Sequence, residues 1–352
     1  MVTETGTAPG EALTRFYAEL DKQDMAPLWE SLHALVPRTP ATMVEAAHWD
    51  YDDVVRPRLM ESGRLITAKQ AERRVLILEN PGLRGMASIT RSLYAGLQLI
   101  LPGEVAPAHR HTQSALRFIV EGSGAHTTVA GERTTMHPGD FVLTPSWTWH
   151  DHGNDSDGPM VWLDGLDIPL VAFLDAGFAE PGESDSQIAA RPEGTSNTHF
   201  AGNLFPVDWR PDSRNSPILN YPYERSRAIL HDLQRGGDPD ACHGFKLRYA
   251  NPADGGWPMP TIGAFIQLLP AGFRSAPYRS TDSTVFSVVE GSGESVIGDR
   301  IIRWKPRDIF VAPSWQRQEH RCDADAVLFS FSDRPVQQGL SLWREERAAP
   351  TV

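Results

Sequence analysis

The sequence contains two copies of one pattern, and this internal repeat limits the possible folds more than any other feature. Gln98 and Gln267 each begin an apolar run that ends at a turn with proline and glycine. Residues 120–124 and 289–293 both read Val-Glu-Gly-Ser-Gly, and each copy later has Pro-Ser-Trp, ending at Trp147 and Trp315. The matches keep nearly the same register over about 50 residues, so the sequence predicts two equivalent domains.

Both copies alternate short β-branched and aromatic runs with Gly, Pro and Asp turns, which is typical of a sandwich or barrel. The N-terminal stretch differs, because apolar residues such as Leu13, Phe16 and Leu20 recur there at helical spacing. We therefore expect a helical N-terminal arm over residues 1–80. Further along, we expect a first barrel over 81–185, a linker or arm over 186–245, a second barrel over 246–340 and a tail over 341–352.

Charge and composition exclude several classes of protein. The formal net charge is 33 − 45 = −12, which disfavours non-specific binding to nucleic acid. No window approaches the roughly 18 unbroken apolar residues of a membrane span, and the N-terminus lacks the pattern of a secretory signal. Cys242 and Cys322 are the sole cysteines, which favours a reducing, cytoplasmic location. An anionic substrate must then be attracted by local arginines.

Three histidines have the spacing of a metal site. His109 and His111 are two residues apart, so in a strand their side chains lie on one face. A run of strand-like sequence separates them from His150, which can return on a neighbouring strand. Three imidazoles that converge in a barrel suit a divalent metal with open coordination positions.

The repeat provides an internal control for this interpretation. All three histidines are replaced in the second copy, although the turn and core residues persist there. The barrel scaffold therefore does not require them, and the first copy keeps them for another purpose. The aligned pairs are His109 and Tyr278, His111 and Ser280, and His150 and Gln318.

The spacing of these residues resembles the two signature motifs of the cupin superfamily. The motifs read Gly103-x5-His109-x-His111 and Gly139-x5-Pro145-x4-His150-x3-Asn154. Cupins are small double-sheet barrels with a central metal, and two copies look like a bicupin. The resemblance implies a mainly β fold, with two double-stranded β-helix (jelly-roll) barrels and a helical N-terminal arm. Ala115 stands where cupins usually have a glutamate ligand, which leaves three protein ligands.

The pattern is similar to the gentisate 1,2-dioxygenase family, with its salicylate and 1-hydroxy-2-naphthoate dioxygenase relatives. The resemblance implies Fe(II) held by the three histidines, cleavage of gentisate by O2 to maleylpyruvate, and a homotetramer. A bidentate substrate and O2 would fill the open metal positions. Positions that match the family's site residues are Tyr94, Gln98, His109, His111, Arg117, His150, His152 and Asp164.

The two arginines are candidates for binding the substrate carboxylate. Arg117 lies at even spacing from the His-x-His pair and faces inward, and its counterpart in the second copy is Phe286. An inward arginine in an apolar barrel needs an anion, either a bound carboxylate or a buried acidic side chain. Arg73, from the N-terminal arm, is a second candidate, with a structural role equally open.

The other candidates have weaker support from the sequence. His152 follows His150 at i+2 and either hydrogen-bonds a substrate oxygen, acts as an acid or base, or is structural, since His320 is its counterpart. Gln98 recurs in the second copy, which favours a scaffold role. Tyr94 and Asp164 are the candidates for recognising the ring 5-hydroxyl, and an exposed turn is the alternative for Asp164.

Other functions remain open at this point. Salicylate or 1-hydroxy-2-naphthoate are alternative substrates within the family. A storage or binding bicupin is the non-enzymatic alternative, but it has no reason to keep three ligands in one copy. A manganese or zinc cupin enzyme usually retains the glutamate that Ala115 replaces. The identity of the metal is open as well, since imidazoles also bind zinc, nickel and copper.

Overall fold

The computed structural model describes residues 9–202 and 204–348, and it divides the chain into two compact units, residues 1–41 and 42–352. The first unit contains α1 (Pro9–Asp21) and α2 (Leu28–Leu35), where helical periodicity predicted helices. The hydroxyl of Tyr17 connects the two helices, because it donates to Glu30 at 2.6 Å and accepts from the indole of Trp29 at 3.0 Å.

The second unit contains both barrels, and each barrel consists of two antiparallel sheets. The strands of the first barrel are β2 (Arg74–Ile77), β3 (Tyr94–Ile100), β4 (Val105–His111), β5 (Ala115–Glu121), β6 (Ala125–Val129), β7 (Glu132–Thr135), β8 (Phe141–Thr144), β9 (His150–Asn154), β10 (Met160–Leu166), β11 (Ala179–Pro181) and β12 (Asn220–Tyr221). One sheet has the order β12-β8-β5-β10-β3-β2, and the other has the order β11-β4-β9-β6-β7.

The second barrel repeats this arrangement. Its strands are β1 (Ala47–Trp49), β13 (Phe245–Arg248), β14 (Gly263–Leu269), β15 (Tyr278–Ser280), β16 (Thr284–Glu290), β17 (Gly293–Ile297), β18 (Arg300–Trp304), β19 (Ile309–Ala312), β20 (Gln318–Arg321), β21 (Ala326–Ser332) and β22 (Glu345–Arg347). The sheets have the orders β1-β19-β16-β21-β14-β13 and β18-β17-β20-β15-β22. The prediction of two jelly-roll barrels is confirmed.

The two barrels share one apolar core. A single cluster of buried side chains draws residues from the six-stranded sheets of both barrels. At its centre, Phe118 of β5 stacks on Phe329 of β21, with ring centroids 4.0 Å apart and planes 7° from parallel. Burial of this apolar area stabilises both barrels together, so the barrels form one packed unit.

Two short strands exchange between the barrels. β1 precedes the first barrel in the chain but pairs with β19 of the second. β12 precedes the second barrel but pairs with β8 of the first. Strands of two or three residues are too short to show a period of two in the sequence, so the periodicity did not reveal them. The division into five predicted segments stays a prediction.

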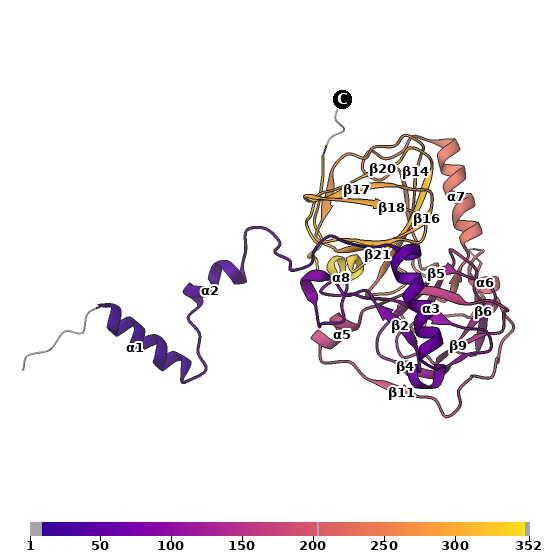
Figure 1. Ribbon diagram of the computed structural model, residues 1–352, viewed down its shortest axis with the longest axis horizontal. Coiled ribbons are helices and arrows are strands. Elements are labelled where there is room, and N and C mark those ends of the chain that lie inside the picture. The colour runs from indigo at the N-terminus through magenta and orange to yellow at the C-terminus, as the bar shows by residue number, and fades with distance from the viewer. Residues whose placement is uncertain (1–8, 203, 349–352) are drawn as a thin grey trace, which may run out of the picture. The chain divides into compact units, whose positions relative to one another are not determined.

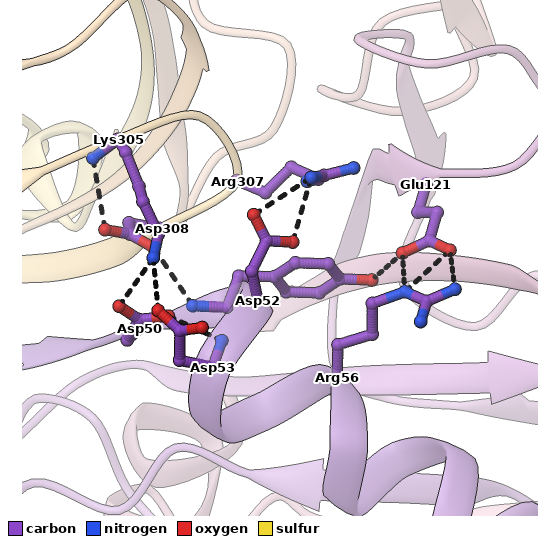
Figure 2. A network of polar contacts seen from close by, with 9 residues as sticks. Asp50, Asp52, Asp53, Arg56, Glu121, Lys305, Arg307 and Asp308 are labelled. Atoms are coloured by element: carbon purple, nitrogen blue, oxygen red, sulfur yellow. Dashed lines mark hydrogen bonds and ion pairs between the residues drawn. The ribbon is translucent and has the colours of Figure 1, made fainter.

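A pair of tyrosines links the barrels in a matching way. Tyr51 and Tyr223 each donate the backbone N–H to an aspartate of one barrel and the hydroxyl to a glutamate of the other. The acceptors are Asp308 and Glu121 for Tyr51, and Asp140 and Glu290 for Tyr223. Arg56 also binds Glu121 (Figure 2), and Arg227 also binds Glu290. These partly buried, charge-assisted hydrogen bonds fix the barrels against each other.

The helices of this unit lie outside the barrels. α3 contacts β2 and β3, and α7 lies along the second barrel against β13 and β14 (Figure 1). No helix in the described part of the chain is long and apolar enough to cross a bilayer. The helices are η1 (Tyr51–Val55), α3 (Arg56–Leu65), α4 (Ala68–Ala71), η2 (Pro81–Leu83), α5 (Ile168–Phe173), α6 (Thr195–Phe200), α7 (Tyr223–Gly236) and α8 (Arg334–Gly339).

Candidate metal centre and active site

The three histidines of the predicted triad meet inside the first barrel. His109 and His111 come from β4, and His150 comes from the neighbouring β9, directly opposite His109 in the strand register. Their rings lie 4.1 to 5.2 Å apart between centroids, and one ligand nitrogen from each lies within 4.8 Å of the others. Alternation along β4 and return on β9 therefore bring the imidazoles together, as the sequence spacing predicted.

In two of the three histidines, a backbone carbonyl holds Nδ1. Nδ1 of His111 lies 2.8 Å from the carbonyl of Gln113, and Nδ1 of His150 lies 2.8 Å from the carbonyl of Thr148. Nε2 of His150 is buried and has no hydrogen-bond partner among the described residues. An imidazole fixed on one nitrogen with the other left free is the usual arrangement of a metal ligand. These residues therefore fit a metal ion.

The environment keeps the three imidazoles neutral, which metal binding requires. Burial lowers the pKa of His109 to about 3, helped by the positive charge of Arg73. Burial also lowers the pKa of His111 to about 4, and nearby Arg117 acts in the same direction. The pKa of His150 lies well below its usual value for the same reasons.

A cavity of about 180 Å³ opens beside the triad. All nine predicted site residues line it, together with four apolar residues that the sequence analysis did not assign to the site. Those four are Val75, Ala115, Leu166 and Ile168. The methyl group of Ala115 occupies the place of the usual cupin glutamate, so no carboxylate from this position reaches the centre.

Arg117 is buried in this cavity wall with one donor unused. Its Nη1 donates to the hydroxyl of Thr144 at 2.5 Å, but its Nε has no hydrogen-bond partner among the described residues. Burial lowers the pKa of Arg117 to about 10, so the guanidinium is still charged at neutral pH. A buried cation with a free donor is suited to binding an anion.

Asp164 lies opposite Arg117 in the register of β5 and β10. Its carboxylate accepts from the indole of Trp162 at 3.0 Å, and burial raises its pKa to about 6. The residue is 6% exposed and lies in a strand, so the alternative of an exposed turn residue is wrong. Asp164 therefore supplies a hydrogen-bond acceptor inside the cavity.

The other candidates complete the wall. Arg73 contacts Nδ1 of His109 and donates to the carbonyl of Pro107 at 2.8 Å. Burial lowers the pKa of the Arg73 guanidinium. His152, fully enclosed behind the triad, has a pKa well below its usual value because of burial, and Nδ1 has no hydrogen-bond partner in the described part of the chain. Burial also raises the pKa of Tyr94.

Sequence reasoning missed the residues that hold these side chains in place. The hydroxyl of Thr144 accepts from Arg117, and the indole of Trp162, which also belongs to a buried apolar cluster, donates to Asp164. The repeat contained a signal for Thr144, because its counterpart in the second copy is Ala312. Thr144 is polar in the first copy alone and lies on the strand next to the inward Arg117. It therefore shows the same difference between the two copies as the histidines do.

Comparison with known proteins agrees with this geometry. A cupin domain family model matches residues 96–167. Gentisate 1,2 dioxygenase 1 of Aquipseudomonas alcaligenes is 57% identical over 332 residues, which cover 94% of this chain and 95% of that protein. The 5-aminosalicylate 1,2-dioxygenase of Comamonas is 37% identical over 96% of this chain and 91% of that protein.

The chain belongs to the gentisate 1,2-dioxygenase family.

A solved member of the wider group has the same fold over nearly the full length. Salicylate 1,2-dioxygenase from Pseudoaminobacter salicylatoxidans, crystallised as adducts with gentisate, superposes with a TM-score of 0.91 at 34% identity. The match covers 99% of this chain and 97% of that one. As a cupin of the gentisate dioxygenase family with three converging histidines, the chain has a metal cofactor site.

Proposed function

We propose that this chain is an Fe(II)-dependent gentisate 1,2-dioxygenase of aromatic catabolism. The observation that carries the proposal is the arrangement of buried Arg117 and partly buried Arg73 on the same cavity as the three histidines. The reaction inserts both atoms of O2 between the carboxyl-bearing ring carbon and the adjacent hydroxyl-bearing carbon, giving maleylpyruvate. Bound Fe(II) supplies coordination sites for substrate and O2 and a path for electron density between them.

The residues of the chain bind and orient the ring. Arg117, with its free Nε donor, and Arg73 pair with the substrate carboxylate. Tyr94 and Asp164 hydrogen-bond the 5-hydroxyl, and Gln98 supports the cavity wall. Apolar side chains such as Leu166 and Ile168 pack against the ring faces and exclude water, which strengthens the polar contacts.

His152 is the proposed acid or base. It follows His150 on β9, lines the same cavity and is 1% exposed. Burial lowers its pKa, so the ring is neutral in the free protein, and the negative charge of a bound substrate would raise the pKa again and favour transfer of a substrate hydroxyl proton to the ring. Replacing it with glutamine keeps a hydrogen-bonding group but removes the base, so kcat should fall with metal content unchanged.

The same cavity makes salicylate and 1-hydroxy-2-naphthoate the second candidates. The structural relative at TM-score 0.91 is named a salicylate 1,2-dioxygenase, and a 38% identical relative from Nocardioides is named a 1-hydroxy-2-naphthoate 1,2-dioxygenase. Tyr94 favours gentisate over both, because its hydroxyl offers a partner for a second ring hydroxyl.

One experiment tests the proposal and ranks the substrates. Purified protein is loaded with Fe(II) without oxygen and titrated with gentisate, salicylate and 1-hydroxy-2-naphthoate. Air-saturated buffer is then added, and O2 uptake and ring-opened product are measured. We expect one O2 consumed per gentisate and the highest kcat/KM for gentisate. Faster uptake with salicylate would reassign the substrate, and uptake with none would leave a metal-binding bicupin of another function.

Assembly and location are part of the proposal. We infer a homotetramer from the family resemblance, with gentisate and O2 as the small-molecule partners. The cysteines Cys242 and Cys322 are both free and buried, which is compatible with a reducing cytoplasm. Light scattering of the purified protein measures the assembly directly.

A further inference from the structure

Asp167 lies where the two barrels meet, and its two carboxylate oxygens bind different barrels. It is 1% exposed and directly follows β10. Oδ1 accepts from the backbone N–H of Ser114 at 2.9 Å, within the first barrel. Oδ2 accepts from the hydroxyl of Thr261 at 2.5 Å, at the start of the second barrel. Asp167 makes no side-chain cap to the helix α5 that follows it, so helix capping does not explain the residue.

The first of these hydrogen bonds leads to a histidine of the triad. The N–H of Ser114 and the carbonyl of Gln113 belong to one planar peptide group. That carbonyl is the partner of Nδ1 of His111, at 2.8 Å. A carboxylate on one side of the peptide therefore fixes the carbonyl that orients the imidazole on the other side. Such a chain also polarises each hydrogen bond in it, which strengthens the last one.

The second copy retains the contact between the barrels but lacks the hydrogen bond that leads, through a peptide group, to a metal-site residue. Asp333 is the counterpart of Asp167, and its Oδ2 accepts from Ser92, the counterpart of Thr261, at 2.8 Å. Its Oδ1, however, has no hydrogen-bond partner among the residues that the structure describes. Ser280 stands in place of His111 there. The connection through a peptide is therefore found in the barrel with the triad.

We propose that Asp167, anchored by Thr261 of the second barrel, is a positioning residue that fixes the tautomer and orientation of His111 through a single peptide group. The second barrel, which lacks the triad, thereby contributes to metal retention in the first. This inference rests on the proposed role of His111 as a metal ligand. Burial raises the pKa of Asp167, whereas the hydrogen bonds from Thr261 and Ser114 act the other way and favour the ionised acceptor.

The test measures metal retention, with no substrate present. Holoprotein loaded with Fe(II) is mixed anaerobically with excess chelator, and the rate of metal loss is followed. Asp167→Ala, which removes both acceptors, should increase the rate by about 10–100-fold, the usual cost of a lost outer-shell partner. Thr261→Val, which keeps the side-chain shape and removes the hydroxyl, should increase it by less. Thr261→Ser should restore the wild-type rate.

Ser92→Ala is the matched control. It removes the equivalent hydrogen bond to Asp333 across the same interface, so it reproduces any general loosening of the barrels. We expect its rate of metal loss to stay at the wild-type value. The visible spectrum of the Co(II)-loaded protein should change in Asp167→Ala and stay unchanged in Ser92→Ala, because that spectrum reports the ligand geometry.

Two results would overturn the inference: equal rates of metal loss for Thr261→Val and Ser92→Ala, or a wild-type rate and Co(II) spectrum for Asp167→Ala. The proposed function fails separately. If the wild-type protein retains metal but cleaves no gentisate, the reaction is wrong, while the difference between Thr261→Val and Ser92→Ala still decides the role of Asp167.

Discussion

Nε of Arg117 lies 3.6 Å from Oδ1 of Asp164, although both side chains are buried. That separation is longer than a hydrogen bond, and Oδ1 already accepts from Trp162. The two charges attract each other, but this separation leaves the Nε donor of Arg117 without a hydrogen bond. The cavity therefore contains a cation with a free donor and a carboxylate with spare acceptor capacity, which is the complement of a hydroxylated aromatic acid.

Replacement of Arg117 by glutamine tests whether the cavity binds the carboxylate of a hydroxylated aromatic acid in this way. The amide is neutral and cannot pair with a carboxylate, so gentisate should bind and react more weakly. Loss of one partner of a buried charged pair costs about 2–5 kcal/mol, which is ~30-fold or more in kcat/KM. Steady-state O2 uptake measures the change, and metal content should stay at the wild-type level. An unchanged KM would show that the carboxylate binds elsewhere.

Removal of the metal should abolish turnover and lower stability together. A ligand present at 100 times its Kd stabilises the folded state by about 2.7 kcal/mol, and chelation removes that contribution. Melting temperature and O2 uptake should both recover when Fe(II) is returned. In His111→Ala, both should be low and insensitive to Fe(II). Turnover that persists in the chelated protein would contradict the metal-dependent mechanism.

The absence of a side chain at Gly96 leaves room for the hydroxyl of Tyr94. A Cβ at this position would lie 2.5 Å from a methyl carbon of Val75 and 2.7 Å from the hydroxyl of Tyr94. In Gly96→Ala, therefore, the tyrosine or the neighbouring strand must move. If Tyr94 recognises the 5-hydroxyl, kcat/KM should fall more for gentisate than for salicylate, which lacks that group. Equal losses for the two substrates would assign the recognition to Asp164.

Lys246 of the second barrel should make stability depend on pH. Its ammonium lies 4.8 Å from the ring of Phe265 and 5.8 Å from that of Phe286. Burial, helped by Arg334, lowers its pKa from 10.5 to about 7. Between those values the unfolded chain binds more protons than the folded one, so this group makes stability rise with pH across that window.

Lys246→Met should therefore stabilise the protein at pH 7, where the cost of burying the ammonium is largest. The gain should shrink as the pH rises toward 10, because the buried amine is then neutral in the wild type. Urea unfolding midpoints at pH 7, 8.5 and 9.5 measure it. A gain of the same size at all three values would show that Lys246 is not the group that titrates.

The tyrosines that link the barrels should contribute measurably to stability. Tyr51→Phe removes a hydrogen bond to the carboxylate of Glu121, and bonds to charged groups are worth about 1.5–3 kcal/mol. Tyr223→Phe removes the equivalent bond to Glu290 and should have a similar cost. Urea unfolding compares the two variants. A loss confined to one of them would show that the symmetry of the contacts does not extend to their energies.

The sequence by itself determined the barrels and the triad. Alternation in a strand places His109 and His111 on one face, and the loss of both in the second copy separates function from scaffold. Local periodicity and internal comparison sufficed here, because both signals lie within a single strand or in the register of the repeat. The inward position of Arg117 follows from the same even spacing.

Only the tertiary structure decided which residues support that site. Thr144 reaches Arg117 from a strand 27 positions away, and Thr261 reaches Asp167 across 94 positions and from the other barrel. The exchange of β1 and β12 between the barrels also depends on pairing with strands that are distant in the chain. Such contacts depend on how the twisted sheets pack in three dimensions. The pattern of neighbouring residues along the chain does not specify which distant side chain lies opposite a given residue.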